Sequence, residues 1–393
     1  MKIRKRILQD MLIILIMLSP TSLSEMFLPY SSYLFMIMQF CIGFLFFRTY
    51  GFLRREKETM LLFSFFFVAA LGMLFNYGTS IKGLIRFGCW MVSILGLYVF
   101  MTRATDQRIK IFLEASRAMY VLGGILTVVC GLKVTDDMAY GTAVFFWGSE
   151  AITVQALIMF FAMSIYYDIR YNERVSKFSI VMGGLSVAFC IYHNSGQGIS
   201  MFGVMIVLML LNKVCYERLW KLAKPMIVLI VLTIIYYLVI TLRFTEISFV
   251  VDYITMVLSK DVSLTGRDAI FKGALEIFSN HPWIGYGYNN AIVNDILGRK
   301  FMQFNTAHNS MLQMLIDYGM IGTGLFISLV YYWMTRMYKQ IEIAPKMVYF
   351  AIIAMFIGGL VNMVVPSNNF WILIILGISS DYPYQNRMDL ETS

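Results

Sequence analysis

Two residues in the second half of the chain have side chains suited to group transfer. Arg267 carries a planar guanidinium group, which can bind a phosphate through two parallel hydrogen bonds. His308 carries an imidazole, which can accept or donate a proton near neutral pH. Both lie in one polar stretch, residues 266–324, of an otherwise apolar chain. Displacement of an anionic leaving group by a hydroxyl would need both groups, a cation to bind the leaving group and a base to accept the proton of the hydroxyl.

Arg267 is predicted to lie near the start of a helix. Thr265 has the residue type of an N-cap, and Asp268 three residues later completes a capping-box pattern. The helix should end at about Asn280, because Pro282 disfavours helical geometry in the residue before it. Helical spacing then separates a solvated stripe from an apolar one, the first being Asp268, Lys272 and Glu276 and the second Ile270, Phe271, Ala274 and Phe278.

Arg267 falls on the apolar stripe of this helix, so its guanidinium should face the membrane domain. A half-buried arginine needs an anion. The sequence leaves two sources open, which are a structural ion pair with Glu150 or Asp252, or a phosphate group of a substrate.

His308 is expected at the mouth of a long apolar segment, with Asn305, Thr306 or Asn309 as the helix cap. The partial positive charge of a helix N-terminus favours the neutral imidazole. A neutral imidazole could serve as a general base. The alternative is a capping or hydrogen-bonding histidine without a catalytic role.

The residues between the two candidates combine turns with aromatic rings. Gly285 and Gly287 allow tight backbone turns. The rings of Trp283, Tyr286 and Tyr288 could stack on sugars or could belong to an aromatic belt at the membrane surface.

The elements that position these residues are predicted to be membrane helices. The chain is 59% hydrophobic and only 14% charged, which indicates an integral membrane protein. We predict an all-α polytopic membrane protein with about twelve transmembrane helices and one large extracytoplasmic loop that contains short amphipathic helices. The predicted spans are 8–23, 30–47, 59–77, 84–101, 111–131, 151–167, 178–193, 198–212, 225–242, 311–334, 346–365 and 368–380.

The loops between these spans alternate in charge. Of the 32 Lys and Arg residues, 23 fall in one set of alternate loops and nine in the other. The positive-inside rule then places both termini in the cytoplasm, in a multi-pass protein of the cytoplasmic membrane. The expected organisation is nine helices over residues 1–242, the large loop over 243–310, three helices over 311–380 and a cytoplasmic tail over 381–393.

Composition and motifs argue against several classes of function. The basic residues are dispersed between apolar segments, so nucleic-acid binding is not expected. The five cysteines lack paired spacing, and the three histidines form no metal-binding motif. We therefore expect no metal site, no cofactor and no nucleotide-powered step.

The order of the motifs in the polar stretch resembles the signature of the O-antigen ligase and polysaccharide polymerase superfamily. The pieces in order are Gly266-Arg267, a helix, Pro282-x-x-Gly285-x-Gly287, His308-Asn309-Ser310-x-Leu312 and Gly319-x-x-Gly322. The similarity covers roughly the last third of the chain, and only the topology matches before it.

This resemblance implies transfer of a glycan from an undecaprenyl-diphosphate carrier to an acceptor hydroxyl, without a metal, on the outer face of the membrane. By matching position, Arg267 would bind the diphosphate and stabilise the leaving group, and His308 would deprotonate the acceptor. Candidate substrate-binding residues are Asn309, Trp283, Tyr286, Gln197 and Arg243. The expected partners are the lipid-linked glycan and the bilayer, with a chain-length regulator left open.

The chain departs from the family pattern at two positions. Family members often carry a second basic residue in the turn between the seventh and eighth spans, where this chain has Gln197, and commonly have tryptophan where it has Phe271. The missing charge could come from another residue, the candidates being Arg243, Lys260, Arg299 and Lys300.

Three functions remain open at this stage. A polymerase would join lipid-linked repeat units into a chain, and a ligase would move a finished glycan to a terminal acceptor. A flippase or other transporter would place charged or broken-helix features near the bilayer midplane. The concentration of ionisable residues in an outer loop favours an enzyme over the transporter.

Overall fold

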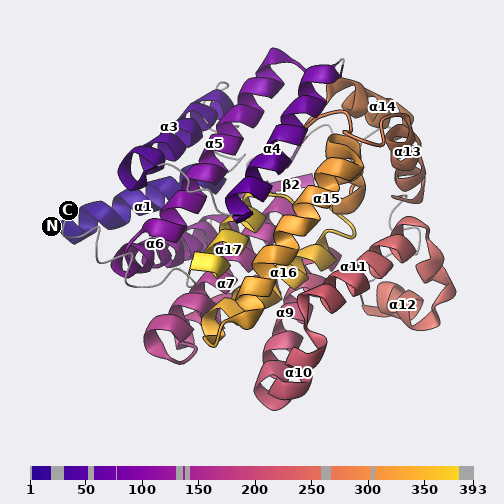
Figure 1. Ribbon diagram of the computed structural model, residues 1–393. Helices are drawn as coiled ribbons and strands as arrows, with labels where there is room; N and C mark the ends of the chain where they lie inside the picture. The colour runs from indigo at the N-terminus through magenta and orange to yellow at the C-terminus, as the bar shows by residue number, and fades with distance from the viewer. Residues whose placement is uncertain are drawn as a thin grey trace.

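The chain folds almost entirely into helices (Figure 1). The computed structural model describes residues 2–18, 31–51, 57–76, 78–129, 136–137, 142–257, 267–301 and 306–379. The α-helices in chain order are α1 (Lys2–Leu18), α3 (Ser31–Tyr50), α4 (Lys57–Phe75), α5 (Ile81–Arg103), α6 (Asp106–Gly124), α7 (Glu150–Asn172), α8 (Lys177–Tyr192), α9 (Gly196–Val214), α10 (Tyr216–Leu222), α11 (Pro225–Ile240), α12 (Ser248–Asp252), α13 (Arg267–Asn280), α14 (Ala291–Phe301), α15 (Ser310–Lys339), α16 (Ile343–Gly358) and α17 (Asn368–Ser379).

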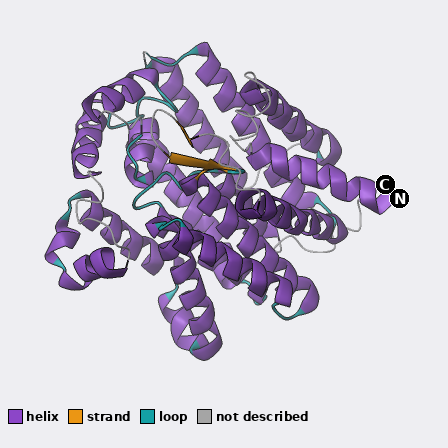
Figure 2. Cartoon of the chain, turned by 180° about the vertical axis from the view of Figure 1, so that it is seen from behind, coloured by secondary structure: helices purple, strands orange, loops and turns teal. Residues whose placement is uncertain are grey.

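Shorter elements join these helices. A π-helical turn, η1 (Ile125–Val129), extends α6, and a 3₁₀ turn, η2 (Arg243–Glu246), and a π-helical turn, η3 (Tyr253–Val257), flank α12. Three short antiparallel strands lie before α7 in the order β1 (Asp136–Asp137), β2 (Thr142–Phe145) and β3 (Gly148–Ser149) (Figure 2).

Six helices within the described residues are long and apolar enough to cross a membrane, namely α3, α4, α5, α7, α9 and α15. The pair α10 and α11, bent by 64°, would make a seventh span. Helices α8, α16 and α17 are apolar but shorter. The fold agrees with an all-α polytopic membrane protein, while the number of twelve spans stays a prediction.

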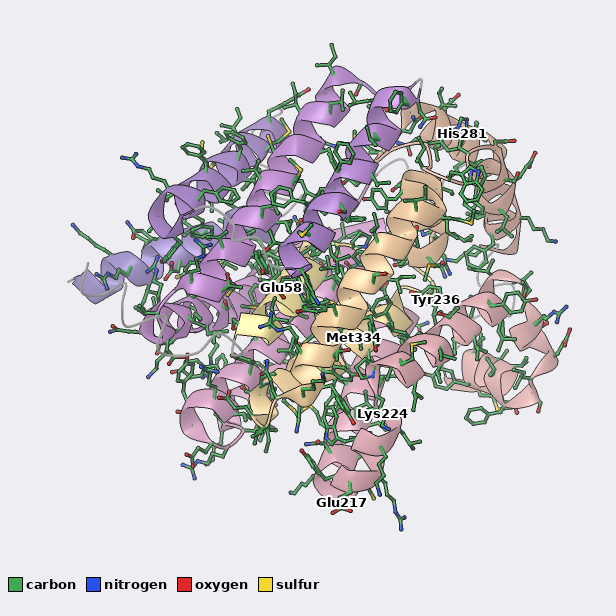
Figure 3. The ribbon with its side chains drawn as sticks, in the orientation of Figure 1. Glu58, Glu217, Lys224, Tyr236, His281 and Met334 are labelled. Atoms are coloured by element: carbon green, nitrogen blue, oxygen red, sulfur yellow. The ribbon has the colours of Figure 1, made fainter. Side chains whose placement is uncertain are left out.

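The ends of the bundle separate residues that were predicted to face opposite sides of the membrane. His281, in the predicted outer loop, lies at the end of the molecule opposite to Glu217 of α10 and Lys224 just after that helix, both in a predicted cytoplasmic loop (Figure 3). This arrangement is what the alternation of charge in the loops requires.

Helices α16 and α17 form the interior of the bundle. Helix α16 packs against α7, α9 and α17, and α17 packs against α5, α7 and α15. Nearly every residue of both helices is buried. Their all-round apolar composition therefore reflects contact with other helices instead of lipid.

The predicted outer helix is present in α13. Phe271 and Ala274 are wholly buried, whereas Lys272 and Glu276 are exposed, so the two predicted faces are confirmed. Helix α13 ends at Asn280, as the following His-Pro pair predicts. Thr265, Gly266 and the side chain of Asp268 lie outside the described residues, so the predicted capping box has no structural description.

The buried face of α13 belongs to a second apolar cluster, separate from the main core. The cluster joins the large loop to the first turns of α15, and its members are Phe244, Ile254, Phe271, Ala274, Ile277, Tyr286, Val293, Leu297, Ala307, Leu312 and Ile316. Helix α14, which was not predicted, supplies two of them. The single interfacial segment predicted at 247–258 is instead divided between α12 and η3.

Helix α15 is broken, although the sequence predicts one uninterrupted span at 311–334. Gly319 has φ 63° and ψ −172°, a conformation that only glycine adopts without strain. In a continuous helix, the Met320 and Ile321 amides would donate to the carbonyls of Ile316 and Asp317. The break removes both of these hydrogen bonds.

The Pro-x-x-Gly-x-Gly turn supplies replacement partners for all four backbone groups at the break. The amides of Tyr286 and Gly287 donate to the carbonyls of Ile316 and Asp317, at 2.7 and 2.9 Å. The amides of Met320 and Ile321 donate to the carbonyls of Pro282 and Trp283, at 2.8 and 3.0 Å. Two helical hydrogen bonds are exchanged for four that attach the large loop to α15. The two glycine motifs are therefore the two halves of one clasp.

Helix α4 completes the clasp from the other side. The side-chain nitrogen of Asn76, the residue after α4, donates to the carbonyls of Gly72 and Gly285, at 2.7 Å each. Gly72 lies against the Ile284 carbonyl, so a larger residue there would separate the loop from α4.

The clasp predicts a large difference between two glycine substitutions in α15. A Cβ atom at Gly319 would collide with the Trp283 carbonyl, whereas one at Gly324 meets nothing within 4 Å. Gly319→Ala should lower the free energy of unfolding by at least about 1 kcal/mol from the backbone conformation alone. Gly324→Ala should leave it unchanged or raise it slightly. Thermal unfolding of both purified variants in detergent measures the difference, and equal midpoints would show that the clasp does not hold the loop.

Candidate functional site

Arg267 is the first residue of α13 and lies on the side of that helix that packs toward α15. Its side chain is half-buried. Burial lowers the pKa of the guanidinium group, which means that the site disfavours an isolated positive charge. A bound anion would remove this penalty.

No structural ion pair for Arg267 is found in the part of the chain that the structure describes. The ion pairs found there belong to other arginines, Arg108, Arg117, Arg170 and Arg336. None joins Arg267 to Glu150 or Asp252, the two predicted alternatives. The alternative of a structural ion pair with one of these carboxylates is therefore not found among the described residues.

His308 lies two residues before α15 in a left-handed backbone conformation with φ 46°. Burial and the positive charge of Arg267 lower the pKa of its imidazole to about 4. His308 is therefore neutral at pH 7. The predicted charge state agrees with this shift, but burial and Arg267 account for it in place of the helix N-terminus. The effect of Arg267 also shows that the two candidates lie within electrostatic reach of each other.

Asn309 holds the backbone that follows His308. Its side-chain oxygen caps α15 by accepting from the Leu312 amide at 3.1 Å, and its side-chain nitrogen donates to the Leu360 carbonyl at 2.9 Å. Asn309 is thus the cap among the three predicted candidates. It is 0% exposed, which favours a role in positioning His308 over direct contact with a substrate.

Ser310 anchors the same backbone to the connection between α16 and α17. Its amide donates to the Gly359 carbonyl at 2.8 Å. Its hydroxyl donates to the Asn362 carbonyl at 3.0 Å and accepts from the amides of Val364 and Val365, at 2.9 and 3.0 Å. The His-Asn-Ser motif therefore consists of one candidate base followed by two residues that fix its place.

Gln313 holds the chain on the other side of His308, and sequence reasoning missed it. Its side-chain oxygen accepts from the Ala307 amide at 2.8 Å, and its side-chain nitrogen donates to Asp317 at 2.9 Å. The spacing of four between Gln313 and Asp317 places both on one face of a helix and could have indicated this pair.

Gln197, at the position where the family often has a basic residue, reaches the same region. It lies in the first turn of α9 and is buried. Its side-chain oxygen accepts from the side-chain nitrogen of Asn362 at 3.1 Å, and its side-chain nitrogen donates to the Met201 sulfur at 3.7 Å. The backbone carbonyl of Asn362 also accepts from the Ser310 hydroxyl. The start of α9 and the His308 motif therefore both bond to the connection between α16 and α17.

The remaining candidates are dispersed. Trp283 is 64% exposed, while Tyr286 is only 9% exposed and packs edge-on against His281 at 4.3 Å. Tyr288 stacks on Trp90 of α5 at 5.8 Å. Of these rings, Trp283 alone presents most of its surface to the outside.

Arg243 is exposed at the start of η2. Within the described residues, no hydrogen bond or ion pair connects it to Arg267 or His308. The other predicted sources of charge, Lys260 and the side chains of Arg299 and Lys300, lie outside the described residues, as does Asn305.

Comparison with known proteins finds a family similarity in the region that contains this site. Residues 182–327 match the model of a protein family described as O-antigen ligase. This segment, somewhat more than a third of the chain, is therefore similar to the O-antigen ligase family. The match confirms the resemblance inferred from the motifs, and it begins earlier than the predicted last third, because it includes the turn at Gln197. No curated protein and no solved structure matches the chain.

The match supports glycan transfer of the O-antigen ligase and polymerase type in general. Arg267, His308, Gln197 and both halves of the clasp all lie inside the matched segment. In the described part of the chain, no group of three His, Cys, Asp or Glu side chains is placed to hold a metal ion.

The electrostatic link between the two candidates can be measured directly. Arg267→Gln removes a positive charge beside His308, so the pKa of His308 should rise from about 4 while staying below the ordinary histidine value of about 6.5, because burial persists. Titration of the imidazole by NMR in a His193→Gln/His281→Gln background isolates the signal. Lys272→Gln, an exposed lysine of the same helix, is the matched control, and an identical pKa in the Arg267 variant would disprove the link.

The anchoring role of Ser310 gives a second prediction. Ser310→Ala would leave the buried Val364 and Val365 amides without their acceptor, which should cost about 1–3 kcal/mol of stability. Ser328→Ala, whose exposed hydroxyl bonds only within α15, should change the unfolding midpoint little. If chemical denaturation gives the same stability for both variants, the anchor is not structural.

Proposed function

We propose that the protein is a polysaccharide polymerase that transfers oligosaccharide repeat units from an undecaprenyl-diphosphate carrier to a growing glycan on the outer face of the cytoplasmic membrane. The observation that carries this proposal is the pairing of Arg267 with His308. A half-buried cation with no carboxylate partner among the described residues lies within electrostatic range of a neutral imidazole. The first suits an anionic leaving group and the second an acceptor hydroxyl.

In the proposed reaction, the bond between the anomeric carbon and the diphosphate oxygen breaks, and a bond from the same carbon to the acceptor oxygen forms. Arg267 binds the diphosphate and stabilises the negative charge that develops on the leaving group. His308 accepts the proton of the acceptor hydroxyl as it attacks. The products are the extended glycan, undecaprenyl diphosphate and a proton that leaves His308 for solvent. No step requires a metal or a nucleotide.

Binding of the donor would also improve His308 as a base. In the free protein, the pKa of about 4 makes the imidazole a weak proton acceptor. A diphosphate on Arg267 would offset the positive charge that holds this pKa down. The pKa of His308 should therefore be higher in the donor complex than in the free protein, which ties proton removal to the presence of the donor.

A ligase is the second candidate, and the description of the matched family favours it. The chemistry at Arg267 and His308 would be the same, because only the acceptor differs. A polymerase extends its own product, whereas a ligase transfers once to a terminal acceptor. A flippase, the candidate of a different class, would move the donor without breaking its glycosidic bond to the diphosphate.

Reconstitution tests the proposal. Protein in lipid nanodiscs, supplied with a synthetic undecaprenyl-diphosphate repeat unit, should give a ladder of products that is unchanged by EDTA. His308→Ala and Arg267→Ala should each slow transfer by about 10²–10⁴-fold. Lys272→Ala should leave the ladder intact, because Lys272 is exposed on the opposite face of α13.

Each departure from this pattern has a distinct meaning. Single transfers onto an added acceptor would establish the ligase, and loss of activity in EDTA would exclude a metal-free mechanism. Normal ladders from both the Arg267 and the His308 variant would disprove the site. With saturating donor, the rate should rise with pH through the pKa of His308 and then level off, because only the neutral imidazole accepts a proton.

The proposed enzyme has a defined orientation in the membrane and a defined set of partners. We place both termini in the cytoplasm and the site outside, and we expect the lipid-linked glycan and the bilayer as partners. A chain-length regulator would be a further partner of a polymerase, and nucleic acid would not.

A further inference from the structure

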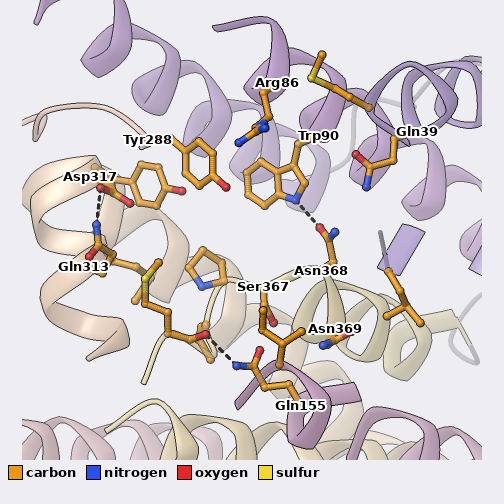
Figure 4. A pocket seen from close by; sticks show the side chains of 18 of the residues that line it. Gln39, Arg86, Trp90, Gln155, Tyr288, Gln313, Asp317, Ser367, Asn368 and Asn369 are labelled. Atoms are coloured by element: carbon orange, nitrogen blue, oxygen red, sulfur yellow. Dashed lines mark hydrogen bonds between the residues drawn. The ribbon is translucent and has the colours of Figure 1, made fainter. Parts of the chain in front are cut away.

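A cavity of about 460 Å³ lies inside the bundle, beyond the helical turn that follows His308 (Figure 4). Its volume falls within the range of roughly 300–1,000 Å³ that is usual for sites of small organic ligands. Residues of α3, α5, α7, α15 and α17 line it, together with Tyr288 of the large loop. Gln313 and Asp317 form the wall on the side of His308, since Gln313 also binds the Ala307 amide. The roles assigned above to Arg267 and His308 leave this cavity unused.

The lining of the cavity has the groups that bind sugars. Trp90 and Tyr288 form an aromatic stack at its rim. Amide side chains surround the remainder, the residues being Gln39, Gln155, Gln313, Asn368 and Asn369. Four of them already make hydrogen bonds within the protein: Gln39 and Gln155 donate to the carbonyls of Ile16 and Met363, Gln313 bonds to Ala307 and Asp317, and Asn368 bonds to Trp90 and Met17. An amide nitrogen has two hydrogens and an amide oxygen two lone pairs, so these groups have further capacity for sugar hydroxyls. Figure 4 shows Gln39, Gln155 and Asn368 around the hollow opposite Tyr288.

Asn369 adds a buried polar side chain to the lining of the cavity. Its side chain is 5% exposed, and its side-chain oxygen has no hydrogen-bond partner among the described residues. An unpaired buried acceptor costs about 1–3 kcal/mol. A hydroxyl group of a bound ligand is the kind of partner that this oxygen requires.

Two ionisable residues, Arg86 of α5 and Asp317 of α15, line the same cavity as Tyr288. Burial raises the pKa of the Tyr288 hydroxyl, and Asp317 and Arg86 shift that pKa in opposite directions. Asp317 is 4% exposed and accepts a hydrogen bond from Gln313. A buried carboxyl group can exchange hydrogen bonds with neighbouring hydroxyls of a sugar.

Arg86 differs from the arginines at the other end of the bundle. Arg108, Arg117, Arg170 and Arg336 each bind a carboxylate. Within the described residues, Arg86 is half-buried and makes no ion pair. Its guanidinium lies beside Tyr288 and Trp90 at the rim of the cavity (Figure 4). A ligand that fills this cavity could therefore supply an anionic group to Arg86.

We infer that this cavity binds a saccharide unit that carries an acidic group. The sugar rings pack against Trp90 and Tyr288, their hydroxyls bond to the amides and Asp317, and the acidic group binds Arg86. This inference deepens the proposed function and rests on it, because it gives the class of glycan that the enzyme handles. The cavity selects the repeat unit, whereas Arg267 and His308 carry out its transfer.

Binding can be tested without catalysis. The probes are a soluble tetrasaccharide that contains one glucuronate, its counterpart with glucose in that place, and geranyl diphosphate, which has no sugar. Equilibrium binding to the full protein in nanodiscs should be tighter for the glucuronate probe than for the neutral one. Arg86→Gln should weaken the glucuronate probe by at least about tenfold and leave the neutral probe unchanged.

Two further variants control for folding. Lys82→Gln alters an exposed lysine that lies one helical turn before Arg86. Lys82 packs over the ring of Tyr33, outside the cavity lining, so this variant should bind both sugars as the wild type does. Asn369→Leu removes the unpaired acceptor, so the unfolding midpoint should stay the same or rise while sugar binding weakens about tenfold. A purely structural Asn369 would lower the midpoint and leave binding intact.

The outcomes separate this inference from the proposed function. Glucuronate binding that is unaffected by Arg86→Gln, or geranyl diphosphate that binds through Arg86 while neither sugar binds, would overturn the saccharide cavity. His308→Ala should retain sugar binding and lose transfer. Wild-type protein that binds the acidic sugar and makes no product from a lipid-linked acidic repeat unit would instead count against the proposed function.

Discussion

The geometry of the candidate site depends on an exchange of hydrogen bonds at the break in α15. A helix broken inside a membrane bundle would leave four backbone groups without partners, and each would be costly away from water. The turn from Pro282 to Gly287 meets all four. The loop and the helix therefore need each other, because the turn has its conformation only against the break and the break is tolerated only under the turn. This mutual requirement fixes the middle of a large polar loop on a membrane helix without any covalent cross-link.

The clasp has an electrostatic consequence for the two candidate residues. It joins the end of α13 to α15, while Asn309, Ser310 and Gln313 fix the backbone on either side of His308. Arg267 and His308 are thus held from opposite ends of the loop and brought into one poorly solvated region. The positive charge of the first then keeps the second neutral. Neither side chain would have this property on a flexible loop in water.

The sequence predicts the parts of the site that depend on local periodicity, and it misses those that depend on long-range contacts. The two faces of α13 and its end before Pro282 follow from residue type and spacing, and they agree with the structure. The sequence also narrows the cap of α15 to three candidates, of which the structure shows Asn309. The break at Gly319 was not predicted, because the hydrogen bonds that stabilise it come from a turn more than thirty residues earlier. Ser310 and Gln313 were missed as anchors for the same reason. The cavity was missed because its lining comes from helices spread over the whole chain.

The burial of α16 and α17 has a consequence for how the protein is made. These two helices follow the candidate site in the chain, yet they occupy the interior and hardly touch lipid. The helices before them must therefore leave a space that α16 and α17 fill. Because Ser310 is anchored to the connection between α16 and α17, the region around His308 cannot assemble until both helices have entered the membrane. A chain that still lacks these helices would carry both candidate residues without the support that places them together, so it would have no formed site.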